Sequence, residues 1–239
     1  MKKKLLGLVI TIVAALSYGG LLQPTDILSS IFPDKEAKTI NVPSKGFSSL
    51  SDFKEFTGDK VYSINNNSPA FTSADLSLEN GTWQTFSDLD HLNRVGAANA
   101  LLHKSSMPTA AERGDIQNVY PSGWNQRKLS DGSWLYNRSH LIGYQLTGEN
   151  DNWKNLFTGT AQSNQTSMLE YENQIASYLR NTNNHVRYRV TPLFIDQELV
   201  CRGIQLEAQS IEDNALCFNV FIYNVSDIAD IDYSTGHIK

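Results

Sequence analysis

The last third of the chain alternates between hydrophobic and polar positions in three segments. Such alternation places every second side chain on one face, and it predicts β-strands at 185–195, 199–211 and 216–225. Between 155 and 181 the spacing changes, and the second half of this segment has the hydrophobic period of a helix. The stripe expected to face the core consists of Met168, Tyr171, Ile175, Ala176 and Leu179.

The middle of the chain contains a turn signal followed by another alternating segment. Asp131-Gly132 is typical of a hairpin turn, and the alternation over 133–142 predicts a strand with His140 at or near its end. Further upstream, 60–72 is typical of a strand that runs into a turn, whereas the apolar spacing over 88–104 predicts a helix. Together these elements predict an α+β fold with a mainly antiparallel sheet and packed helices.

The N-terminus carries a targeting signal. Three lysines follow Met1, and residues 5–22 then form an apolar run without a charge. Within 1–22 a cleaved signal peptide and a retained membrane anchor remain open alternatives, because the run is intermediate in length between the two. The prolines of 23–46 predict a linker, and 47–239 are expected to form the folded domain. In both alternatives the domain works outside the membrane, either secreted or anchored to its outer face.

The two cysteines, Cys201 and Cys217, lie on either side of a turn predicted at 212–214. An exported chain can form disulfides. Folding about this turn, however, places Cys201 opposite residue 224 and not opposite Cys217. The pattern therefore favours two free thiols.

The net charge of −5 argues against a protein that coats nucleic acid, because such binding depends on Lys and Arg neutralising phosphates. An enzyme that releases its polymer is less constrained. Between His91 and His140, basic residues outnumber acidic ones, which indicates a local basic surface. These basic residues are Arg94, Lys104, Arg113, Arg127, Lys128 and Arg138.

The pair Ser139-His140 suggests a serine nucleophile with its base, but adjacent strand residues point to opposite faces. The downstream helix offers other partners for the histidine. Glu172 lies on the stripe expected to face inward, where a carboxylate needs a partner or a metal. Asn164, eight residues earlier, offers a neutral oxygen ligand. A histidine facing this amide and carboxylate suits a hydrated Mg²⁺ that bridges to a substrate phosphate.

Several segments resemble the DNA/RNA non-specific endonucleases, a family with a ββα-metal fold. "NRSH" at 137–140 resembles their Asp-Arg-Gly-His motif, and "NLFTGTAQSNQT" at 155–166 with "EYEN" at 170–173 is similar to their metal-binding helix. The resemblance covers 47–239 and is closest to streptococcal secreted DNases and membrane-anchored DNA-entry nucleases. Further similar segments are 87–116, "YPSGW" at 120–124 and "HVRYRVTPLF" at 185–194.

The resemblance implies a role for each candidate residue. His140 would be the general base and Asn164 the direct metal ligand. Glu172 would hold the water shell of the metal, and Arg138 would contact either the phosphate or the surrounding site. Ala176 stands where some members carry a helical arginine. Arg180, Arg187 and Arg189 remain alternatives for that cation. The residues expected to contact nucleic acid are Arg127, Lys128, Arg180 and Arg187.

The sequence thus predicts a sequence-non-specific endonuclease that depends on Mg²⁺, with Mn²⁺ as a substitute ion. It would cleave DNA and leave 5′-phosphate ends, as the family does, with RNA left open as a second substrate. It would meet the membrane only through its N-terminal segment and need no protein partner. The alternatives are a DNA-binding or uptake protein that keeps the fold without catalysis, and a phosphodiesterase acting on small molecules.

Overall fold

The computed structural model describes residues 53–109 and 113–239. The predicted targeting segment, 1–22, and the predicted linker, 23–46, lie outside the described residues. Among the helices of the described part, none is long and apolar enough to cross a membrane.

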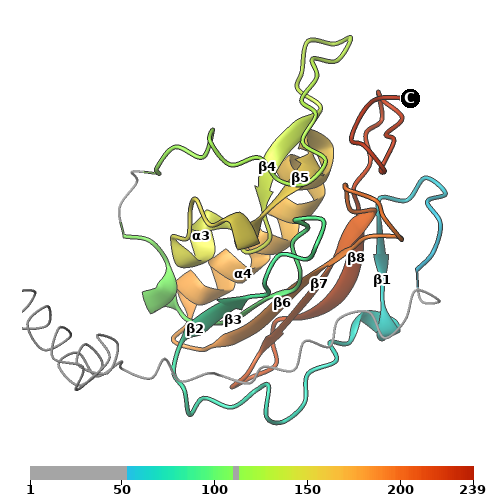
Figure 1. Ribbon diagram of the computed structural model, residues 1–239. Coiled ribbons are helices and arrows are strands. Elements are labelled where there is room, and N and C mark those ends of the chain that lie inside the picture. The colour runs from blue at the N-terminus through green and yellow to red at the C-terminus, as the bar shows by residue number, and fades with distance from the viewer. Residues whose placement is uncertain (1–52, 110–112) are drawn as a thin grey trace, which may run out of the picture. The chain divides into compact units, whose positions relative to one another are not determined.

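The main sheet has six antiparallel strands in the order β1-β8-β7-β6-β3-β2, and β4 and β5 form a separate antiparallel pair (Figure 1). The strands are β1 (Val61–Ser63), β2 (Trp83–Phe86), β3 (Ala98–Leu102), β4 (Tyr136–His140), β5 (Leu156–Thr160), β6 (Val186–Leu193), β7 (Gly203–Ser210) and β8 (Cys217–Tyr223). The α-helices are α3 (Tyr144–Thr147) and α4 (Leu169–Asn181), and the π-helix η5 (Ser163–Met168) leads directly into α4. Short 3₁₀ turns are η2 (Asn65–Asn67), η3 (Lys104–Ser106) and η4 (Trp153–Asn155).

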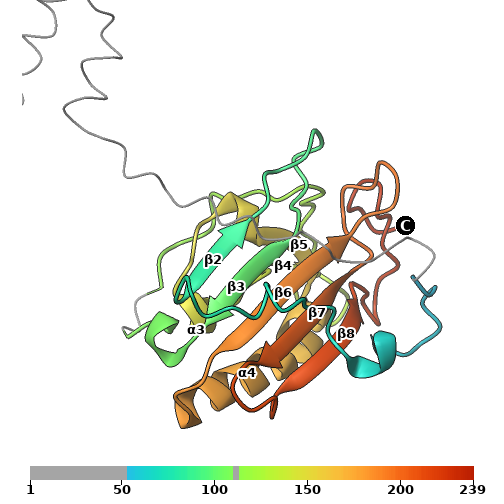
Figure 2. The same ribbon diagram turned by 90° about the horizontal axis from the view of Figure 1, so that it is seen from below.

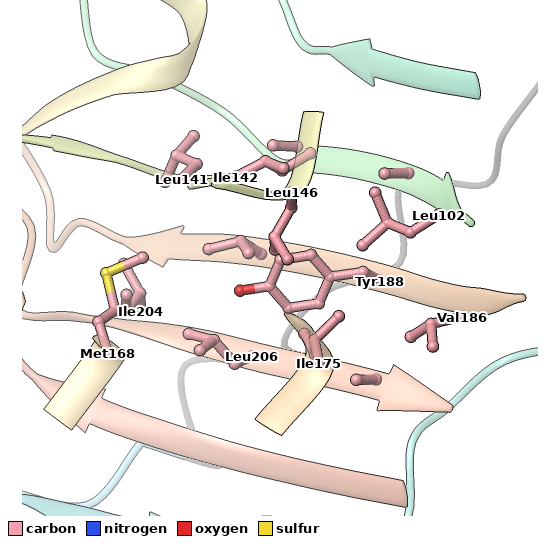
Figure 3. Packing of buried hydrophobic residues seen from close by; sticks show 14 of the residues in the cluster. Leu102, Leu141, Ile142, Leu146, Met168, Ile175, Val186, Tyr188, Ile204 and Leu206 are labelled. Carbon is pink, nitrogen blue, oxygen red and sulfur yellow. The ribbon is translucent and has the colours of Figure 1, made fainter. Parts of the chain in front are cut away.

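Helix α4 packs its apolar stripe on one face of the main sheet. Ile175, Ala176 and Leu179 are fully buried there. Figure 3 shows the ring of Tyr188, from the central strand β6, between Leu146 and Ile175. The alternation that predicted β6, β7 and β8 is confirmed, because Val186, Tyr188 and Val190 point to this core. The α+β fold with a mainly antiparallel sheet is confirmed as well.

The opposite face of the sheet is crossed by the segment 68–82, here called the strap (Figure 2). Two arginines of β6 point toward it. Arg189 pairs with Glu207 of β7 at 2.7 Å, and the carboxylate of Glu207 also accepts the backbone N–H of Ala70 in the strap. Arg187 lies 3.6 Å from Asp75 of the strap, and its guanidinium stacks over the ring of Phe71. Because these charges are buried, their pairing fixes the strap on the sheet.

The helix predicted over 88–104 is wrong. Its second half is strand β3, which pairs with both β2 and β6. In the first half the carboxylate of Asp90 accepts the backbone N–H groups of Leu92 and Arg94, and Asn93 has a positive φ of 58°. Such local side-chain hydrogen bonds compete with helical ones. The helix-like spacing of the apolar residues therefore arose by chance, from a turn that is followed by a fully buried strand.

Both cysteines are free, as the turn geometry favoured. Cys201 is buried, and its neighbour is Asn224, whose side-chain amide donates to the Cys201 carbonyl at 3.0 Å. The pairing of Cys217 with Gln209 in the β7–β8 ladder leaves the two sulfurs on different parts of the sheet.

Candidate active site

His140 is the last residue of β4, as predicted, and both of its ring nitrogens have partners. Nε2 lies 2.8 Å from the backbone carbonyl of Asn150. A carbonyl can only accept, so Nε2 carries the proton and Nδ1 holds the free electron pair. The guanidinium of Arg113 donates to that Nδ1 at 3.0 Å. The nitrogen able to take a proton from a substrate or water is therefore Nδ1.

The surroundings of His140 favour its neutral form. Its pKa is lowered from 6.5 to about 4, mainly by burial and in smaller part by the positive charge of Arg113, while the hydrogen bond to Asn150 opposes the shift. At pH 7 the ring is consequently unprotonated at Nδ1. This is the state that a general base needs.

Ser139 points away from His140 and belongs to the core. It is fully buried, and a Cβ placed on Gly159 of the paired strand would meet its Oγ at 2.2 Å. Gly159 is thus the residue that makes room for this serine between β4 and β5. Ser139 serves packing at the strand end, as the alternation of the strand predicted.

Glu172 faces the site from the first turn of α4. Its carboxylate accepts the backbone N–H of Gly143 and the side-chain amide of Gln145. Burial raises its pKa from 4.5 to about 7 despite these hydrogen bonds and the nearby charge of Arg113. Gly143 is needed at this spot, because any Cβ there would lie 2.5 Å from the carboxylate.

The raised pKa of Glu172 predicts that its ionised form destabilises the metal-free protein. The folded state holds this proton up to about pH 7, whereas the unfolded chain releases it near 4.5, so stability is lost as the pH rises between these values. Glu172→Gln stays neutral and keeps an acceptor. We expect it to raise the unfolding free energy in EDTA at pH 8 by about 3 kcal/mol, and by little at pH 4.5.

Thermal or urea unfolding of both proteins in EDTA at pH 4.5 and pH 8 measures this difference. The titration of His140 is common to both proteins, so it cancels in the comparison. An identical pH dependence for the wild type and Glu172→Gln would contradict the prediction.

Asn164 lies in the π-helix η5, and its side chain lines the same cavity as His140 and Glu172. This cavity has a volume of about 290 Å³. Among the described residues, the Asn164 amide has no hydrogen-bond partner. The wider turn of a π-helix often occurs at functional sites, and here it exposes an unpaired amide to the cavity. The structure thus brings together the three residues that the sequence singled out.

Arg113 completes this group, and sequence reasoning did not assign it a role. It appeared only as one of six basic residues upstream of His140. Its guanidinium contacts His140 and lies over the ring of Tyr144 at 5.3 Å. The side chain is exposed and lines the cavity. No local pattern could have identified it, because the contact joins residues 27 positions apart.

The other predicted cations lie in different surroundings. Arg138 lines the cavity, but its guanidinium donates to the backbone carbonyls of Val119 and Gln117 at 2.5 and 2.7 Å. Arg127 and Lys128 are exposed on the hairpin that leads into β4. Arg180 is exposed near the end of α4 and lines a separate hollow that includes Lys104.

The prediction that Arg187 contacts nucleic acid is wrong. Its side chain is fully buried on the strap side of the sheet, the face opposite α4. Arg189 is buried on that same face, and Ala176 is part of the core under α4. Neither Arg187 nor Arg189 can therefore replace the helical arginine that some family members carry at the position of Ala176. Alternation along β6 sends residues 187 and 189 away from Tyr188, which faces the helix.

The donor set fits a hydrated divalent cation. Glu172 is a buried carboxylate for which the described residues offer no ion pair, and the neighbouring Asn164 amide is unpartnered. The described part of the chain contains no cluster of three His, Cys, Asp or Glu side chains suited to a metal. A closed zinc site therefore has too few ligands here, whereas Mg²⁺ keeps most of its water and needs few protein oxygens.

Comparison with known families decides the identity. Residues 76–212 match the DNA/RNA non-specific endonuclease family. The chain belongs to this family. The protein is therefore an endonuclease, and its fold of an antiparallel sheet with few helices matches the ββα-metal nuclease fold that the sequence predicted.

Solved structures similar to this endonuclease include NucA from Streptococcus agalactiae. The magnesium-bound form of NucA is 29% identical with a TM-score of 0.67, and the match covers 75% of this chain and 87% of NucA. The metal-free form is 30% identical with a TM-score of 0.66, covering 75% and 86%. Sda1 nuclease, solved with a zinc ion, is 24% identical with a TM-score of 0.59, covering 66% and 81%.

Proposed function

We propose that this endonuclease hydrolyses phosphodiester bonds of DNA with the help of Mg²⁺ and without sequence specificity, with RNA as a second substrate to be tested. The observation that carries the proposal is the meeting of His140, Asn164 and Glu172 in one cavity. Three separate elements deliver these side chains: the end of β4, the π-helix and the first turn of α4.

His140 acts as the general base in this proposal. Its Nδ1 accepts a proton from water, and the oxygen of that water attacks the phosphorus. The bond from phosphorus to the 3′ oxygen breaks, that oxygen takes a proton from solvent water, and the products carry a 3′-hydroxyl and a 5′-phosphate. The carbonyl of Asn150 holds the ring by Nε2, so that Nδ1 faces the cavity throughout.

Arg113 supplies the cation for the phosphate. In the free protein it covers Nδ1 of His140. An anionic phosphate is a better partner for a guanidinium than a neutral imidazole, because it adds attraction between opposite charges and can accept two parallel N–H bonds. Substrate binding would therefore draw Arg113 to the phosphate and uncover the base. Arg138 stands beside the same cavity and, through its bonds to residues 117 and 119, holds the chain that follows Arg113.

Asn164 would hold the ion directly, and Glu172 would hold it through water. A bound Mg²⁺ supplies polarisation of the phosphate and stabilises the leaving oxygen. Support for this ion comes from the donor chemistry and from the magnesium-bound form of NucA; Mn²⁺ is expected to substitute.

The proposed place of action is outside the membrane. The support is the uncharged apolar run at 5–22, which follows three lysines. Cleavage of this segment would favour degradation of environmental DNA, and its retention would favour processing of DNA at the cell surface. The mass of the mature N-terminus distinguishes these two roles.

Asn164→Ala tests the metal site. We expect its activation constant for Mg²⁺ to rise by about 100-fold or more, because even outer residues of metal sites typically cost 10- to 100-fold in affinity. Nicking of supercoiled plasmid over a Mg²⁺ series, with an EDTA control and a parallel RNA substrate, measures it. Thermal unfolding with and without Mg²⁺ gives a readout that does not depend on activity.

The matched control is Gln174→Ala, which removes an exposed amide from the outer face of α4. It should match the wild type in both measurements. Full wild-type nicking in EDTA would contradict metal dependence, and an unchanged Mg²⁺ response of Asn164→Ala would contradict its role as ligand.

A further inference from the structure

A second hollow adjoins the catalytic cavity on the side of the hairpin that leads into β4. It has a volume of about 530 Å³ and shares Arg113, Arg138, Asn164 and Gln165 with the catalytic cavity. The two hollows are therefore parts of one surface. In Figure 1 this hairpin extends away from the body of the fold, just before β4. A nucleic-acid strand whose phosphate lies at His140 would therefore run along this second hollow.

Three aromatic side chains line the second hollow, and they differ in availability. Tyr136 is fully buried, and its hydroxyl donates to the carbonyl of Gly236. Trp124 is half-buried, with the guanidinium of Arg138 over its ring at 4.3 Å. Trp134 is 54% exposed, although its neighbours Leu135 and Tyr136 are buried. Of these three rings, Trp134 has the face that a ligand can reach.

The charge around Trp134 fits a nucleic acid. The ammonium of Lys128 lies 5.9 Å from its ring centre, and Lys128 and Trp134 are paired across the hairpin. Arg127 is exposed next to Lys128. An exposed indole beside cations can stack on a base while the cations meet the backbone phosphates. In a closed duplex the bases stack on one another, so only an unpaired base offers its face to the indole.

We propose that Trp134 is a stacking platform for an unpaired base next to the cleaved phosphate, so that this endonuclease binds single-stranded nucleic acid more tightly than closed duplex. The inference rests on the proposed function, because it places the substrate strand through His140. Stacking on a protein aromatic ring accounts for about a 5- to 150-fold change in affinity per base when the ring is removed.

The test compares Trp134→Ala and Trp134→Phe with the wild type on three oligonucleotides of equal length. These are a single strand, a closed duplex, and a single strand whose bases are replaced by tetrahydrofuran abasic sites. We expect Trp134→Ala to raise KM on the base-bearing single strand by about 5- to 150-fold with kcat within about twofold, and Trp134→Phe to lie between. On the abasic strand, wild type and Trp134→Ala should have the same KM.

Trp153→Ala is the matched control, since Trp153 is 49% exposed but lines neither hollow. It should leave KM unchanged on every substrate. An unchanged KM of Trp134→Ala on the single strand would overturn the inference. An equal rise on all three substrates would overturn it as well, because the effect would then not depend on bases. Failure of the proposed function has a different signature, namely that the wild type cleaves none of the substrates in Mg²⁺.

Discussion

His140→Ala should lower kcat on plasmid DNA by about 100- to 10,000-fold, the range typical of a lost general base. The substitution removes Nδ1, the one ring nitrogen whose electron pair faces the cavity, and leaves the guanidinium of Arg113 without this partner. Binding of DNA should persist, since the phosphate cations remain. Single-turnover cleavage at saturating Mg²⁺ measures the loss directly, and thermal unfolding shows whether the variant is folded.

His91→Ala is the control for this experiment, because His91 is an exposed histidine away from the cavity. The pH dependence adds a second criterion. Since the pKa of His140 is lowered from 6.5 to about 4, the acid limb of kcat/KM at saturating Mg²⁺ should lie near pH 4 and not near 6.5. Wild-type cleavage by His140→Ala would rule out the proposed base.

Arg187→Ala should destabilise the protein by about 3–5 kcal/mol, because it leaves the carboxylate of Asp75 buried without its cation. The guanidinium also donates to the side chain of Asn99 at 2.6 Å and to the carbonyl of Tyr188 at 2.7 Å. Burial lowers the pKa of Arg187 to about 10, so the side chain remains charged at pH 7. Urea unfolding gives the free energy of unfolding for comparison with the wild type.

Arg180→Ala provides the matched comparison, since Arg180 is exposed and should change stability by less than about 0.5 kcal/mol. The double variant Arg187→Ala with Asp75→Ala should cost less than the sum of the single variants, because it leaves no unpaired charge. A normal unfolding free energy for Arg187→Ala, combined with weaker DNA binding, would contradict the buried role.

The parts of the fold that the sequence predicted correctly depend on local alternation. The strand ending in His140 and the three C-terminal strands have one face against the core, and this leaves a period of two in the sequence. The segment 88–104 failed because β3 is buried on both faces, so its residues carry no alternation. The helix-like spacing of its apolar residues was therefore not opposed by a period of two that would have indicated a strand.

The sequence predicted a site residue correctly where that residue lies on a helix or strand whose hydrophobic period shows which face points inward. Glu172 was identified because a charge interrupts the apolar stripe of α4. Arg187 was assigned wrongly because the sequence does not show that the strap covers the second face of the sheet. Arg113 received no role because it reaches His140 from an irregular segment, whose path depends on tertiary contacts.

The π-helix before α4 also affects how this chain is compared with its relatives. A π turn holds more residues than an α turn, so the position of Asn164 relative to Glu172 depends on the number of residues between them as well as on their identity. Asn164 is followed at once by Gln165, a second amide that lines the same cavity. An alignment that shifts by one residue in this turn would exchange the two amides. Equivalent ligands in homologous nucleases must therefore be matched in three dimensions, and counting back along the sequence from the glutamate is not sufficient.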